Sequence, residues 1–235
     1  MVHLEAVLRR HGIADADVAK LAAFESRNGF SVLSKDEFDE MRKYFGDFPV
    51  YQFLVPLLTD NNSNYYCLYV DGPLKNMTCY LNHEELDLAP RFRSLASFLD
   101  AVADYPHRFG MDDFEARFFD FPSREVSPNY AQDQEIISVL YQMLAAATDD
   151  DQRTQTAFAL MALASPADLE AVIYPFLDDE DMYVQERAIR LLGFHAYKPA
   201  AAKLKALTTN AHPNGRLAAR IALQKIADSR GLNCH

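Results

Sequence analysis

The sequence has little of what several large functional classes require. Its 8 glycines are scattered along 235 residues, so no glycine-rich loop is present to hold a phosphate. Its 23 Lys and Arg face 34 Asp and Glu, a formal net charge of −11, which argues against nucleic acids and anionic membranes as partners. No run of about 18 apolar residues occurs, so we expect no membrane span.

Cysteine is also scarce, and its three positions are Cys67, Cys79 and Cys234. An odd count, with no signal-peptide pattern at the N-terminus, predicts reduced thiols in a cytoplasmic protein. Cys67 and Cys79 fall in neighbouring strand-like segments near His83, so a zinc site there is one alternative. Because no CxxC pair exists, we favour small residues of a half-buried sheet, and we expect no metal and no cofactor.

Catalytic motifs are missing as well. Ser, Cys and His fall in no GxSxG, HExxH or papain-like context. The segment Asp60-x-Asn62-x-Asn64 resembles the start of a calcium loop, but Tyr65 stands where that loop needs glycine. We interpret it as a hairpin turn. We therefore expect a protein that is not an enzyme, and an active-site cleft that leaves no sequence signal is the alternative.

The chain divides into two parts with different patterns. Residues 1–127 mix helix and strand signals, whereas residues 131–235 show only helical patterns. The join lies near Ser127-Pro128-Asn129, after a loop rich in phenylalanine and proline. Two domains are the expectation.

In the first part, Asp15 is the expected N-cap of a helix that runs to Arg27 and ends at Asn28-Gly29. Ser34 and Glu37 form a capping box at the start of a second helix. Strands are expected over residues 53–58, 65–70 and 77–80, and a closing helix carries Leu95, Phe98, Leu99 and Val102. Turn-forming residues between the strands predict an antiparallel meander.

Aromatic residues are frequent in this part of the chain. They alternate in ways that fit the two faces of a strand, first at Phe45, Phe48, Tyr51 and Phe53, and later at Tyr65, Tyr66 and Tyr69. We expect most of these rings to lie in the core. Tyrosines on an outer face would instead serve as interface anchors, because they provide contact area at a low entropic cost.

This order of elements resembles the SUKH superfamily over roughly residues 15–105. The resemblance is carried by Pro56-Leu57-Leu58, the segment Tyr65-Tyr66-Cys67-Leu68-Tyr69, the turn Gly72-Pro73, His83, and the segment Ser94-Leu95-Ala96-Ser97-Phe98-Leu99. It implies an α+β domain in which an antiparallel sheet packs with helices. It also implies a bacterial immunity protein that neutralises a toxin.

The second part repeats itself. Asp150, Asp181 and His212 are spaced 31 residues apart, and Ala157, Ala188 and Ala219 share that period. Residues 181–193 are similar to the second helix of a HEAT-type repeat. Further helical segments precede each unit at residues 135–146, 167–177 and 200–207. The resemblance implies an all-α HEAT-like solenoid of about three helix pairs over residues 131–235.

Acidic residues gather at two corresponding turns of these repeats. They are Asp149, Asp150, Asp151, Asp178, Asp179, Glu180 and Asp181. Neighbouring helices lie about 10 Å apart, so the seven carboxylates are expected to line one edge as a protein-binding surface. The alternative is that Asp150 and Asp181 cap helices and the others favour the positive helix N-termini.

These observations favour a non-enzymatic protein-binding module. The leading hypothesis is an immunity protein that occludes a cognate toxin, which is expected to be basic, such as a nuclease. The rival is an intracellular scaffold or regulator that holds a peptide or protein in the solenoid groove. We expect no nucleic-acid or membrane partner.

Overall fold

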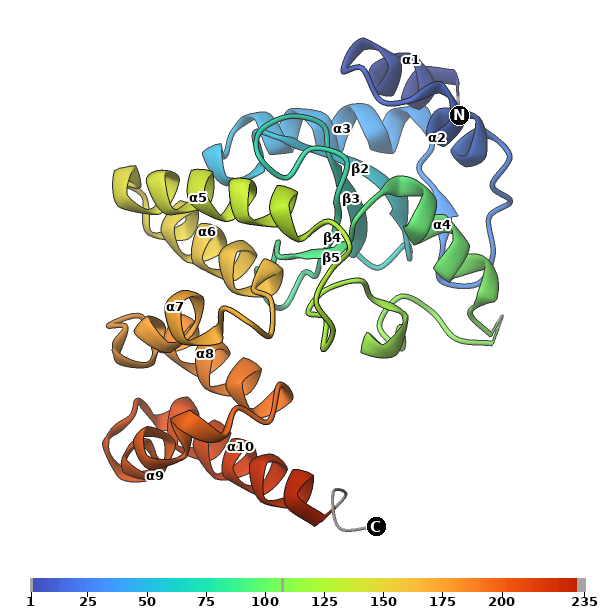
Figure 1. Cartoon of the computed structure of the whole chain (residues 1–235). Helices are drawn as coiled ribbons and strands as arrows, with labels where there is room; N and C mark the ends of the chain where they lie inside the picture. The colour runs from blue at the N-terminus through green and yellow to red at the C-terminus, as the bar shows by residue number, and fades with distance from the viewer. Residues whose placement is uncertain (1, 107, 232–235) are drawn as a thin grey trace. The chain divides into compact units, whose positions relative to one another are not determined.

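The computed structural model describes residues 2–106 and 108–231. It divides into two compact units, Met1–Phe121 and Pro122–His235. The described residues of the first unit combine a five-stranded antiparallel sheet with helices, and those of the second are helical (Figure 1). The prediction of an α+β protein is therefore confirmed.

The first unit begins with helices and then forms its sheet. Its helices are α1 (Val2–Arg10), α2 (Asp15–Ala22), α3 (Lys35–Gly46) and α4 (Leu95–Asp104), with 3₁₀ turns η1 (Pro49–Tyr51) and η2 (Ala116–Phe118). Its strands are β1 (Ser31–Val32), β2 (Leu54–Thr59), β3 (Tyr65–Tyr69), β4 (Thr78–Leu81) and β5 (Pro90–Phe92). The sheet order is β1-β2-β3-β4-β5.

The predicted meander is confirmed for β2, β3 and β4, which pair antiparallel with their neighbours in the chain. Cys67 lies directly opposite Cys79, and both thiols are free and fully buried. Burial raises the pKa of Cys67 well above its usual value, so this thiol stays protonated. Cys234 lies outside the described residues. The short strands β1 and β5 were not predicted.

The core of the first unit is built from large rings on one face of the sheet. Tyr66 is fully buried and stacks on Phe98 of α4, with ring centroids 4.4 Å apart. Phe92 and Phe114 complete the group, and Phe114 meets Tyr66 edge-on at 6.1 Å. These rings join α4 to the sheet by burying large apolar area.

Helix starts were predicted with mixed success. Ser34 caps α3 and forms the expected capping box with Glu37. The prediction for the helix over residues 15–27 was wrong at both ends. Asp15 is its first helical residue, after an N-cap at Ala14 without a side-chain bond, and the helix stops at Ala22.

Arg27, which the prediction placed at the end of this helix, lies beyond it and binds α4 instead. Its guanidinium donates to the carbonyl oxygens of Val102 and Tyr105 at 2.7 Å each, and of Pro106 at 2.9 Å. It thereby caps the C-terminus of α4, where the exposed carbonyls attract a cation. Asn28-Gly29 forms the tight turn that returns the chain, with Gly29 at φ +70°.

The aromatic run at the end of α3 is not a strand, so that prediction was wrong. Phe45 lies in α3 and is buried, whereas Phe48 precedes the 3₁₀ turn that ends at Tyr51. The run is therefore a helix end followed by a 3₁₀ turn, and Phe48, extended between them, is 43% exposed.

Within the described part of the second unit, helices pair along the chain. The elements are α5 (Tyr130–Ala146), α6 (Asp150–Leu163), α7 (Leu169–Val172), η3 (Tyr174–Asp178), α8 (Met182–Phe194), η4 (Lys198–Ala200), α9 (Ala201–Asn210) and α10 (Pro213–Gly231). Figure 1 shows α5 beside α6, α7 beside α8, and α9 beside α10. The helix predicted over residues 167–177 is confirmed only at α7, because Pro175 cannot continue a helix and a 3₁₀ turn replaces its second half.

Small residues bring these helices close together. Ala157, Ala188 and Ala219, which share the 31-residue period, are all fully buried. A Cβ added at Gly193 of α8 would lie 2.7 Å from the Cα of Ala222 in α10. The spacing of α8 and α10 therefore depends on the absence of side-chain atoms at this point.

Candidate protein-binding surface

The two predicted acidic turns precede α6 and α8, and bonds between their elements hold them together. Arg153 of α6 donates to both carboxylate oxygens of Asp179, at 3.2 and 2.7 Å. Thr154 donates to Asp181 at 2.6 Å. Neighbouring repeats are thus joined by charge-assisted bonds at their turn ends.

Several of the seven predicted residues have structural roles. Asp149 caps α6 by accepting from the backbone N–H of Gln152 at 2.9 Å, so the expected cap at Asp150 was one residue out. Asp181 caps α8, as the alternative interpretation expected. Burial pushes the pKa of Asp181 upward, but bonds from Thr154 and from the backbone of Tyr183 and Val184 outweigh it and lower the pKa.

Two more of the predicted carboxylates are paired inside the unit. Asp179 is only 7% exposed and is neutralised by Arg153. Asp178 accepts from Lys203 of α9 at 2.5 and 2.7 Å. Asp150, Asp151 and Glu180 remain exposed, and no ion pair within the described residues involves them. We call these three residues the acidic edge.

The third turn has no such cluster. Here Gln185 of α8 donates to the carbonyl of Leu177 at 3.0 Å and accepts from the backbone N–H of His212 at 2.9 Å. Gln185 follows Thr154 by one 31-residue period, and each side chain bonds the turn of the next repeat. The contact to the next turn therefore recurs at the same position of the 31-residue period. Thr154 bonds a carboxylate there, whereas Gln185 bonds backbone groups.

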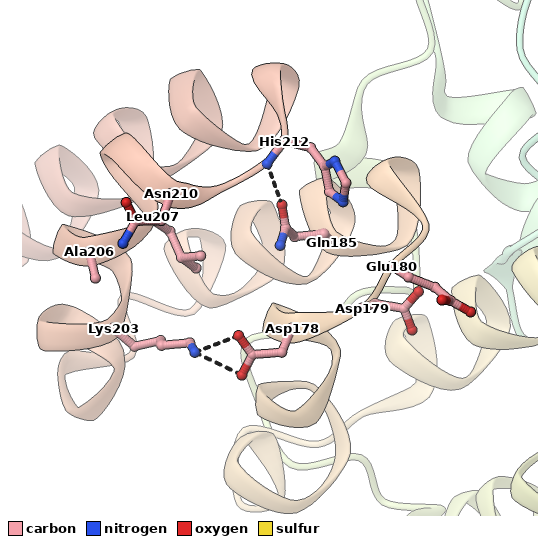
Figure 2. Close-up of a pocket in the computed structure, with 9 residues that line it drawn as sticks. All are labelled: Asp178, Asp179, Glu180, Gln185, Lys203, Ala206, Leu207, Asn210 and His212. Carbon is pink, nitrogen blue, oxygen red and sulfur yellow. Dashed lines mark hydrogen bonds and ion pairs between the residues drawn. The ribbon is translucent and has the colours of Figure 1, made fainter.

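A pocket of about 470 Å³ opens beside this turn. Figure 2 shows it between the Asp178–Lys203 pair and His212, with the lining residues Asp178, Asp179, Glu180, Gln185, Lys203, Ala206, Leu207, Asn210 and His212. Its polar groups are of mixed charge. Sequence reasoning missed the contribution of Lys203, whose partner lies 25 residues away.

One exposed aromatic residue adjoins the acidic edge. Tyr183, in the first turn of α8, is 58% exposed and lies three residues after Glu180. Tyrosine is a common anchor of protein interfaces, because its ring buries much area with few rotatable bonds. The sequence marked the tyrosines of the sheet as anchors, but not this one.

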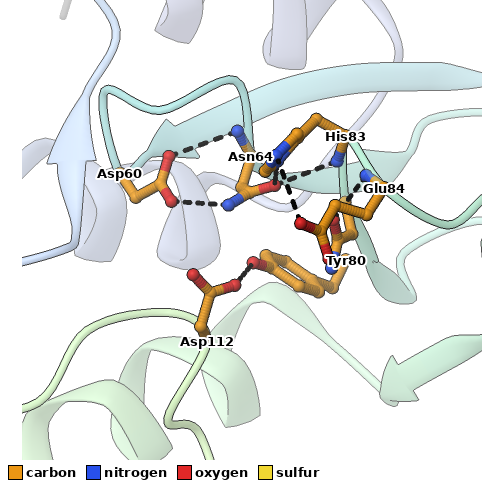
Figure 3. Close-up of polar contacts among 7 residues, drawn as sticks. Asp60, Asn64, Tyr80, His83, Glu84 and Asp112 are labelled. Carbon is orange, nitrogen blue, oxygen red and sulfur yellow. Dashed lines mark hydrogen bonds and ion pairs between the residues drawn. The ribbon is translucent and has the colours of Figure 1, made fainter.

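The hairpin segment Asp60–Asn64 closes on itself, as expected. Asp60 accepts from the backbone N–H of Asn62 at 2.7 Å and of Asn64 at 3.2 Å, and its second oxygen accepts from the Asn64 amide at 2.7 Å. The buried Asn64 side chain also binds the backbone N–H and Nδ1 of His83 (Figure 3). The carboxylate and amide are therefore occupied in fastening β2–β3 to the end of β4.

A second polar contact in Figure 3 joins Tyr80 to Asp112, with 2.5 Å between the hydroxyl and carboxylate oxygens. Burial and this bond raise the pKa of Tyr80 far above its usual value. Burial also raises the pKa of Tyr66 to about 12, although Arg91 acts in the opposite direction. Both phenols are thus held un-ionised at neutral pH and serve to fix the loop that carries Asp112.

Among residues 2–106 and 108–231, no group of three or more His, Cys, Asp or Glu is arranged to hold a metal ion. In the same ranges, no helix combines the length and the apolar character needed to cross a membrane. Comparisons with protein-family models, curated proteins and solved structures returned no match.

Proposed function

We propose that this protein is a non-enzymatic binding protein whose acidic edge receives a basic protein partner. The observation that carries the proposal is the different use of the seven acids. Asp149, Asp178, Asp179 and Asp181 are engaged internally, so they fix the turns. Asp150, Asp151 and Glu180 are exposed and form no ion pair with another described residue, although Glu180 lies close enough to Arg153 to raise its pKa, behind the larger effect of Asp179. Carboxylates that stand on such fixed turns attract a cationic surface, and the turns need not rearrange when the partner binds.

The partner we propose is a basic toxin domain, and the function is immunity by occlusion. The support is the resemblance of residues 15–105 to the SUKH superfamily and the net charge of −11. The HEAT-like arrangement of the second unit belongs to the same proposal. Occlusion needs no catalysis, only a complementary surface that buries about 1,200 to 2,000 Å².

The direct experiment co-expresses the protein with the toxin encoded beside its gene. We expect a stable complex and rescue of growth. If the toxin kills equally well with and without the protein, and no complex forms, the proposal fails.

Charge reversal tests the acidic edge itself. We expect the triple change D150K, D151K and E180K to slow association with the toxin about tenfold and to flatten its salt dependence. The matched control D104K, E125K and E135K alters three other exposed acids by the same total charge. Equal slowing in both triples would show a general charge effect and remove the acidic edge from the proposal.

A second candidate function is a scaffold that holds a peptide. The 470 Å³ pocket beside Lys203 and His212 favours it, because this volume suits a small ligand or a peptide side chain. Enlarging Ala206 to Phe would fill the pocket. Loss of partner binding in A206F, with binding retained in the acidic-edge triple, would favour the scaffold.

A further inference from the structure

A cluster of rings lies at the C-terminal end of α3 in the first unit. Tyr44 and Phe48 are 46% and 43% exposed, and their ring centroids are 5.0 Å apart. Tyr51 meets Phe48 edge-on at 6.0 Å and stacks on the buried Phe45 at 4.9 Å. We call Tyr44, Phe48 and Tyr51 the aromatic patch. The stacking on Phe45 attaches this patch to the core, so its rings are held in place before any partner arrives.

In this chain, arginine side chains often lie over the faces of aromatic rings. Eight arginine–ring contacts occur among the described residues, including Arg91 over Tyr80 at 4.5 Å and Arg187 over Phe158 at 4.4 Å. Neither Tyr44 nor Phe48 takes part in any of them. Two exposed ring faces in mutual contact are therefore open to a cation from outside.

Acidic side chains flank the patch. Glu40 precedes Tyr44 by four residues, which places both along one side of the helix, and the exposed Lys43 lies in the same last turn. Glu37 lies two turns from Tyr44 and is held in the capping box with Ser34. Asp47 follows the helix directly and is exposed. Arg42 projects from another side of the helix, close to His11. Burial is the main cause that lowers the pKa of His11, and the charge of Arg42 lowers it further.

The charge of the unit agrees with this local pattern. Residues 122–235 hold 11 basic and 14 acidic residues, so residues 1–121 account for −8 of the total −11. A second copy of the chain would bring like charges together at this face, which opposes a symmetric contact. A purely apolar partner would desolvate Glu40 and Asp47 without pairing them.

We propose that the aromatic patch, with Glu40 and Asp47 beside it, is a docking site for an arginine of a basic protein partner. The guanidinium plane stacks on Tyr44 and Phe48, and its N–H groups reach a neighbouring carboxylate, a geometry that lysine cannot reproduce. The inference deepens the proposed function, because it gives the first unit a contact with the same class of partner. It specifies the side chain that is recognised.

The test titrates the full-length protein with hexa-arginine and, separately, with hexalysine, at about 20 mM salt to limit screening. The ring resonances of Tyr44 and Phe48 are followed by NMR, together with the backbone amides of Asp150, Asp151 and Glu180. We expect the rings to respond to hexa-arginine with at least a threefold tighter dissociation constant than to hexalysine.

The variants separate stacking from apolar contact. The double change Y44S and F48S should weaken the response of the neighbouring Asp47 amide about tenfold, and Y44L with F48L should remove the preference for arginine while keeping apolar area. The double change L217S and I221S, at two residues of α10 that are 60% and 49% exposed, is the matched control and should retain the response. Circular dichroism checks that each variant is folded.

The outcomes distinguish this inference from the proposed function. Unchanged rings, or equal affinity for both peptides, would overturn the inference. A response confined to the amides of Asp150, Asp151 and Glu180 would also overturn it and would leave the proposed function standing. Arginine-selective ring shifts, in a protein that neither binds nor neutralises the toxin, would keep the docking site and refute the immunity function.

Discussion

The two units differ in the side chains at their closest packing contacts. In the first unit, Tyr66, Phe92 and Phe98 fill the space between the sheet and α4. In the second, Ala188 and Gly193 occupy the contacts between helices, and the helices approach closely because little lies between them. The first unit should therefore be most sensitive to removed volume, and the second to added volume.

Removing the central ring of the first unit should have the largest effect. We expect Y66A to cost about 3 to 5 kcal/mol of unfolding free energy, because a fully buried ring leaves a cavity among its ring partners. Urea denaturation followed by circular dichroism measures it. Y183A removes a ring that is 58% exposed and should change stability by less than about 0.5 kcal/mol. Similar losses of unfolding free energy in Y66A and Y183A would show that the first unit is not especially sensitive to removed volume.

Adding one methyl group should have the next largest effect, and in the second unit. We expect G193A to cost about 1 to 3 kcal/mol, since the new Cβ would lie 2.7 Å from the backbone of Ala222. The loss must exceed the gain of about 1 kcal/mol that alanine brings to a helix.

Gly46 provides the control for that substitution. It ends α3, and a Cβ there would meet nothing within 4 Å. G46A should therefore leave stability unchanged or raise it slightly, through helix propensity alone. Thermal unfolding of both variants gives the sign of each change, and a stabilised G193A would show that α8 and α10 can move apart at no cost.

The sequence predicted those parts of the fold whose causes lie within a few residues. The capping box of Ser34 and Glu37 depends on residues three apart, and the hairpin at Asp60–Asn64 on residues four apart. Arg27 was predicted inside α2, but it lies beyond that helix and binds carbonyl groups 75 residues or more away. No local pattern carries that information, and the helix was predicted too long.

The candidate surface shows the same limit. The positions of the seven acids are plain in the sequence, but which of them remain free depends on Arg153 and Lys203, at distances of 26 and 25 residues. The aromatic patch was missed because Tyr44 and Phe48 sit where the helical face turns from core to solvent. A strand-like alternation of Phe45, Phe48 and Tyr51 hid that boundary.

The smallest predicted effect concerns charge in the second unit. His195 follows α8, and its Nε2 is buried with no hydrogen-bond partner. Burial chiefly, and the charge of Arg124 secondarily, lower the pKa of His195 from 6.5 to about 4. The folded state therefore resists a proton that the unfolded chain accepts near pH 6.5, so stability is full above that pH and falls as the pH drops towards 4.

Between pH 7 and pH 4.5 we expect His195 to account for a loss of about 1 to 2 kcal/mol, allowing for the water that still reaches the ring. Hydrogen exchange of the α8 amides measures this in the second unit alone. H195Q should remove that part of the pH dependence, and R124Q should reduce it, because a repelling charge is lost. If the stability of H195Q falls with pH as that of the wild type does, burial of His195 does not limit the stability of the second unit at low pH. Packing at Gly193 and Ala188 then sets that stability instead.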